Sequence, residues 1–168
     1  MLGVVGLAGC AGPVETRVGR AGDAIAHPSP VAVAPVAIAA VTGAGDLSGP
    51  ALTAVMQALA RRGIAVADNA PARLTIALAE RPAEMGVTGD DGLVLSAAKR
   101  SRLLQDCADR KHRLLLVLDR AGTPPVRAWA EEDHCKGTLA AGLTPLAESA
   151  VAALAGDRSG VLLRAGRD

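Results

Sequence analysis

The sequence predicts an α+β fold, a mainly antiparallel sheet with helices packed on one face in a single domain. Its 168 residues, half of them apolar, suit one domain of ordinary size. Runs with strand periodicity and runs with helix periodicity follow one another in the order strand, helix, two strands, helix, hairpin, helix. Because this order lacks the regular strand–helix alternation of a parallel sheet, it favours antiparallel pairing.

The first predicted elements lie between residues 31 and 80. Val31–Val41 is an apolar run of strand length, with a bulge or an edge position expected at Pro35. Ala51–Arg62 repeats apolar residues at spacings of three and four, which predicts a helix. Ile64–Ala67 is expected to form a short strand, and Ala72–Glu80 alternates as a half-buried strand does.

The second half contains a loop, two helices and a hairpin. Arg81–Gly92 is rich in Gly and Pro and reads as a loop, and Ser96–Asp109 is expected to be helical. His112–Asp119 and Pro125–Glu132 are two apolar runs joined by a short connection, which predicts an antiparallel hairpin. Thr138–Ala155 is expected to form the closing helix.

The N-terminal residues carry a localisation signal. Leu7, Ala8 and Gly9 before Cys10 resemble the lipobox of bacterial lipoproteins. The resemblance implies cleavage before Cys10 and acylation of that residue. Because Ala11 is not the aspartate associated with inner-membrane retention, it implies the periplasmic face of the outer membrane. The alternative is a cytosolic protein with a frayed apolar N-terminus.

These features divide the chain into four parts. Residues 1–9 are expected to be the remnant of a signal peptide whose true start lies upstream, since no basic residue precedes the apolar stretch. Residues 10–30 read as the lipidated cysteine and a flexible tether, because they show no sustained period. Residues 31–155 should form the folded periplasmic domain, and residues 156–168 a loose tail.

The two remaining cysteines are expected to form a disulfide. If lipid consumes Cys10, then Cys107 and Cys135 are the even number expected in an oxidising compartment. A hairpin centred near Ala121 pairs residues placed symmetrically about it, and these two cysteines are so placed. The alternative is a pair of buried free thiols in a reduced cytosolic protein.

The chain is also similar, as a pattern, to small bacterial envelope lipoproteins. These include the DUF4136-type group and the N-terminal domain of TolB-like proteins. The similarity rests on the lipobox, on Val31–Val41 leading into Ala51–Val66, and on Arg113–Asp133, where a strand turns into one bearing Trp129. It implies an accessory, assembly or binding role in the envelope and brings no catalytic motif with it.

A glycine-rich turn supports an alternative function, a nucleotide- or dinucleotide-binding enzyme. A strand, this turn, an amphipathic helix and a second strand ending in an acid look like the opening of a short-chain dehydrogenase. The residues concerned would be Gly43, Gly45, Gly49 and Asp68. However, Leu47 or Ser48 stands where a further glycine is required, and the chain contains no tyrosine to act as that family's acid.

A metal site is not expected. Cys107, His112, His134 and Cys135 are zinc ligands by type. The hairpin spacing places the two histidines roughly 13 Å apart, too far for one ion. They are therefore expected to be solvated, as are the carboxylates of Glu131–Asp133.

Composition excludes a further class of partner. The net charge is +1 and Trp129 is the only aromatic residue, so neither a basic face nor a stacking platform for nucleic acid is present. We expect no cofactor and no catalytic residue. The expected partners are the membrane, through the lipid, and an envelope protein that the sequence does not identify.

Overall fold

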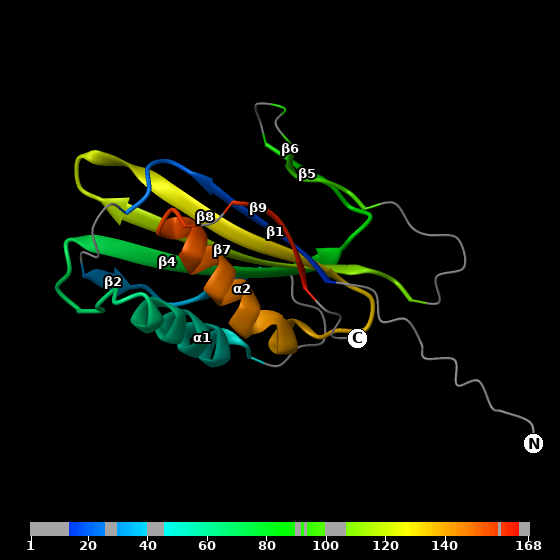
Figure 1. Ribbon diagram of the computed structural model, residues 1–168, viewed down its shortest axis with the longest axis horizontal. Coiled ribbons are helices and arrows are strands. Elements are labelled where there is room, and N and C mark those ends of the chain that lie inside the picture. The colour runs from blue at the N-terminus through cyan, green and yellow to red at the C-terminus, as the bar shows by residue number, and fades with distance from the viewer. Residues whose placement is uncertain are drawn as a thin grey trace, which may run out of the picture.

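A seven-stranded mixed sheet forms the centre of the computed structural model, which describes residues 14–25, 30–39, 46–89, 92, 94–99, 107–157 and 159–164 (Figure 1). In chain order the elements are β1 (Val14–Ala21), β2 (Val31–Val33), β3 (Ala37–Ala39), α1 (Ser48–Arg61), β4 (Ala72–Pro82), β5 (Val87–Thr88), β6 (Val94–Ser96), β7 (Arg110–Arg120), β8 (Thr123–His134), α2 (Leu139–Leu154) and β9 (Gly160–Arg164). Two helices and a sheet in one domain confirm the α+β class.

The sheet has the order β2–β4–β7–β8–β1–β9, with β3 also beside β4. From β4 to β9 all neighbours are antiparallel, whereas β2 and β3 run parallel to β4. Pro35 lies between β2 and β3 and belongs to neither strand, so the predicted run Val31–Val41 is interrupted there.

The predicted hairpin is the pair β7–β8. Leu114 lies opposite Ala130 and Leu116 opposite Ala128, so large side chains meet small ones on the core face. The connection is a two-residue turn whose Gly122 has φ 76°. The sequence predicted a longer loop, so the observed strand pairing is shifted by two residues from the predicted pairing. A shift of two residues keeps every side chain on its predicted face of the sheet.

The two helices lie next to each other (Figure 1). α2 packs against β7, β8 and β1, and α1 packs against α2. The Thr138 hydroxyl accepts a hydrogen bond from the backbone N–H of Ala141 and so caps α2. None of the helices in the described ranges is long and apolar enough to cross a membrane.

Two strands lie where a tether and a tail were expected. β1 falls within residues 10–30 and is enclosed between β8 and β9, with Val14, Thr16 and Val18 buried. β9 falls within residues 156–168 and pairs with β1. The tether and tail predictions are therefore wrong for these segments, because the pairing of such strands is set by their neighbours in the sheet rather than by a local apolar pattern.

Two other predicted elements differ. Ile64–Ala67 contributes only the single bridge Val66–Val31. Within the expected helix Ser96–Asp109, the described ends are not helical: Ser96 closes β6 and Asp109 precedes β7. In the expected loop Arg81–Gly92, the strand β5 pairs with β6, and this hairpin stands off the main sheet (Figure 1). We call the hairpin and its flanks, residues 83–89 and 94–99, the arm.

Candidate functional site

Most buried polar side chains lie at one end of the sheet, where β7 begins and β8 ends. We call this region the polar end. Because side chains alternate along a strand, the polar end has two faces, one toward the helices and one toward the open side of the sheet. Its buried members are Thr16, Glu80, Ser96, Lys111, His112, Glu131, Glu132 and His134.

The face toward the helices carries a pair of stacked histidines. The ring centroids of His112 and His134 are 4.8 Å apart, and both side chains are buried. His134 Nε2 lies 2.9 Å from a carboxylate oxygen of Glu132, whose other oxygen accepts a 2.9 Å hydrogen bond from the Thr16 hydroxyl. His112 Nε2 lies 3.2 Å from Glu80 without the alignment of a hydrogen bond.

The chain leading into α2 packs closely over this pair. A Cβ on Gly137 would lie 2.5 Å from His134 Nδ1, and one on Gly142 would lie 3.8 Å from His112 Nδ1. Burial, together with the nearby charges of His134 and Arg110, lowers the pKa of His112 to about 4. His112 is therefore neutral near pH 7.

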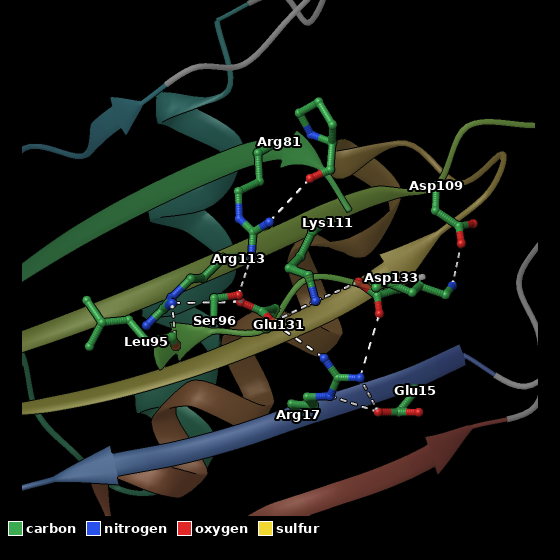
Figure 2. A network of polar contacts seen from close by, with 12 residues as sticks. Glu15, Arg17, Arg81, Leu95, Ser96, Asp109, Lys111, Arg113, Glu131 and Asp133 are labelled. Carbon is green, nitrogen blue, oxygen red and sulfur yellow. Dashed lines mark hydrogen bonds and ion pairs between the residues drawn. The ribbon is translucent and has the colours of Figure 1, made fainter. Parts of the chain in front are cut away.

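The open face carries a cluster of opposite charges around a buried lysine (Figure 2). Lys111 is 1% exposed, and its Nζ lies 2.9 Å from a carboxylate oxygen of Glu131 and 2.9 Å from one of Asp133. Arg17 Nη atoms lie 3.9 Å from each of the same two carboxylates. The buried charges thus balance one another within the cluster.

The same cluster fastens the arm to the sheet. The Ser96 hydroxyl donates a 2.5 Å hydrogen bond to Glu131 and accepts one from Arg81. Arg113 donates to the carbonyl of Leu95 at 3.3 Å. Lys99 Nζ lies 2.6 Å from a carboxylate oxygen of Asp109, just before β7.

The expected disulfide is present beside the polar end. Cys107 and Cys135 are bonded, with their Cα atoms 5.6 Å apart. They and Asp109 form the one group of three possible metal ligands found within the described residues, but sulfurs joined in a disulfide supply no thiolate. We derive no metal chemistry from this group.

The estimated separation of the two histidines is wrong. In the observed register His112 lies opposite Glu132, so His134 is its diagonal neighbour on the same face. The histidines and Glu131–Asp133 are also largely buried, where solvated residues were expected. In the observed register the run Arg110–Arg113 faces the acids Glu131–Asp133 across the hairpin. Opposite charges on facing strands attract, so this match of charges was the sequence signal for the observed register.

Of the residues proposed for a dinucleotide site, the structure describes Gly49 and Asp68. Gly43, Gly45 and Cys10 lie outside the described residues. Gly49 is in the first turn of α1, and Asp68 is exposed in the turn after Val66.

Strand pairing places the described ends of these segments at different levels of the sheet. Val66 bridges Val31, which pairs with Ala72 of β4, whereas Ala39, the last described residue before the glycine turn, pairs with Ala79. Seven residues of strand, roughly 23 Å, separate these levels. In a dinucleotide site the acid and the glycine turn lie at the same strand ends.

The groups at the polar end contact one another rather than an open cavity. A hollow of about 640 Å³ lies elsewhere, between the C-terminal ends of the helices. Across it Arg61 pairs with Glu148 at 3.0 Å, and Arg62 pairs with Asp157. In this structure the polar end joins the arm to the sheet through Ser96, and its histidines lie against the chain that leads into α2.

No protein-family model and no curated protein matches the chain. Two similar solved structures are described as PelC dodecamers from Paraburkholderia phytofirmans. One, in space group P6, is 21% identical with a TM-score of 0.51, and covers 83% of this chain and 96% of that chain. The other, a single-substitution variant in space group C2, is 22% identical with a TM-score of 0.50 and the same coverage. At this identity the similarity shows a shared fold.

Proposed function

We propose that this chain is a lipid-anchored, non-enzymatic accessory or assembly component of the bacterial cell envelope. It is held at the periplasmic face of the outer membrane. The observation that carries the proposal is the disulfide between Cys107 and Cys135. It leaves Cys10 as the single remaining cysteine of the three, directly after the lipobox-like Leu7–Gly9. A disulfide is typical of an exported chain.

The position of β1 supports a close attachment to the membrane. β1 begins at Val14, four residues after Cys10. An extended chain of four residues reaches about 14 Å. An acyl group on Cys10 would therefore hold the polar end within that distance of the lipid surface.

Self-association is part of the proposal. The two similar structures are described as dodecamers, and each covers most of this chain. A fold that can assemble with itself is suited to an accessory or assembly role, because the copies together build a surface that one copy lacks. An envelope protein remains the expected further partner.

The alternative, an enzyme that binds a nucleotide at Gly43 to Gly49, is tested by thermal shift. We expect the melting temperature of the purified protein to stay unchanged with NAD, NADP or ATP. A concentration-dependent rise with any of them would favour the enzyme, because a ligand that binds the folded state stabilises it.

The experiment for the anchor compares the wild-type protein with Cys10→Ala, each expressed behind a full-length secretion signal. The wild type should enter the outer-membrane fraction, with an acylated Cys10 in its N-terminal peptide by mass spectrometry. Cys10→Ala should remain soluble in the periplasm, whereas the control Cys135→Ser should stay with the membrane. A soluble wild type with an intact, unacylated residue 1 would refute the proposal.

A further inference from the structure

The arm exposes a group of apolar side chains away from the core. Met85 is 56% exposed, Val94 67% and Leu95 52%, and Val87 also faces solvent. Figure 1 shows β5 and β6 projecting from the main sheet on the side opposite the helices. Exposed apolar side chains gathered in this way mark an interaction surface.

The arm is fixed at its base by the charges described above. Ser96 joins it to the buried Glu131, and the Lys99–Asp109 ion pair joins it to the chain before β7. A backbone hydrogen bond of 2.7 Å from Lys99 N to the carbonyl of Ala83 ties its two flanks together. The apolar side chains are therefore presented from a fixed base, as a contact surface requires.

A second apolar patch lies at the edge strand β9. Val161 is 60% exposed and Leu163 is 69% exposed. Val161 pairs with Arg17, which pairs with Glu131, so both patches belong to the open side of the sheet. The patches are separate, because β9 lies beyond β1 at the edge of the sheet, whereas the arm follows β4.

We propose that the arm of one copy packs against β9 of the next copy, in a head-to-tail contact. Two different patches on one chain are what a head-to-tail contact needs, and such contacts build rings when the rotation between copies closes and open filaments when it does not. A net charge of +1 leaves little repulsion between copies. The inference rests on the self-association proposed above and specifies which surfaces make it.

The first test measures the oligomeric mass of the full-length lipidated protein in mild detergent, by light scattering after gel filtration. The wild type should be an oligomer, and the double variant Val94→Asp with Leu95→Asp should elute with the mass of a single chain. The matched control places the same charges on α1, as Leu52→Asp with Met56→Asp, two positions that are each 37% exposed. The control should remain an oligomer, and circular dichroism should show that all three proteins are folded.

The second test identifies the two partners of the contact. Copies carrying Val94→Cys are mixed with differently tagged copies carrying Leu163→Cys and treated with a bismaleimide cross-linker. The mixture should give cross-linked pairs bearing both tags, whereas each variant alone should give none. A mixture of Val94→Cys with Leu52→Cys serves as the control and should also give none.

The outcomes distinguish a failure of self-association from a failure of the arm contact. A monomeric wild type would refute the proposed self-association and this contact with it. An oligomeric wild type whose arm variant stays oligomeric would refute the arm contact alone. Cross-linking of Val94→Cys to itself would show an arm-to-arm contact and would equally overturn the head-to-tail arrangement.

Discussion

The imidazole rings of His112 and His134 stack with an angle of 22° between their planes, buried between two carboxylates. Burial lowers the pKa of His112 from 6.5 to about 4, so the folded protein favours the neutral ring. The unfolded chain binds the proton more strongly. The contribution of His112 to the stability of the fold is therefore fully present above pH 6.5 and is lost as the pH falls from 6.5 toward 4.

We expect the free energy of unfolding to fall by about 2–3 kcal/mol from the titration of His112 between pH 7.5 and 4.5. Urea titrations at the two pH values measure the loss. His112→Gln removes the titrating group, so its loss over the same range should be smaller by that amount. Equal losses in the wild type and the variant would show that His112 keeps an ordinary pKa.

Gly19 lies beneath the indole of Trp129, its pairing partner on β8. A Cβ at Gly19 would clash with the ring, so Gly19→Ala should displace the indole and destabilise the fold by about 1–3 kcal/mol. Because Trp129 is the single tryptophan, its fluorescence should shift to the red. Gly49→Ala is the control, since a Cβ there has nothing within 4 Å. An unchanged emission spectrum in Gly19→Ala would contradict the placement of the ring.

Lys111→Met should destabilise the protein strongly. The substitution leaves Glu131 and Asp133 buried without their lysine, which costs about 3–5 kcal/mol for a buried ion pair. Arg61→Met removes one partner of the half-exposed pair with Glu148 and should cost less than about 1 kcal/mol. Denaturant titration compares the two variants, and similar losses would contradict the burial of Lys111.

The disulfide should contribute substantially to stability. It closes a segment between residues 28 positions apart, for which the chain-entropy model gives about 3.5 kcal/mol. The double variant Cys107→Ser, Cys135→Ser should lose about this amount in a denaturant titration. Thiol titration of the denatured, unreduced protein from the periplasm is the direct check. Two reactive thiols besides Cys10 would refute the bridge and weaken the argument for export.

The elements that could be predicted from sequence are those with a long regular pattern. The hairpin, α2 and most of α1 were predictable because apolar residues repeat along them at strand or helix spacing. β1 was not, because polar residues, Thr16 and Arg20, stand on its core face among the few apolar ones. β9 is only five residues long, and its pairing with β1 is set by the tertiary structure.

The burial of the polar end could not be predicted from the sequence, for a different reason. Lys111 and Glu131 read as solvated surface, since charged residues at strand ends usually are. Their burial depends on the arm, which joins this face through Ser96 from another part of the chain. Such burial has no local signal, whereas the pairing of Cys107 with Cys135 could be predicted from the even count of cysteines left if Cys10 is lipidated. The symmetry about Ala121 did not support it, because the observed register of the hairpin differs by two positions.

The place of β1 in the sheet also sets the order in which the domain can fold. Thr16 bonds to Glu132, 116 positions later, and β1 pairs with β9 as well as β8. Contacts this distant in sequence make folding slow, because the intervening chain must be gathered first. During synthesis or export β1 emerges before β8 and β9, and it can pair with them only after both have emerged. We therefore expect the segment next to Cys10 to be among the last parts of the domain to become ordered.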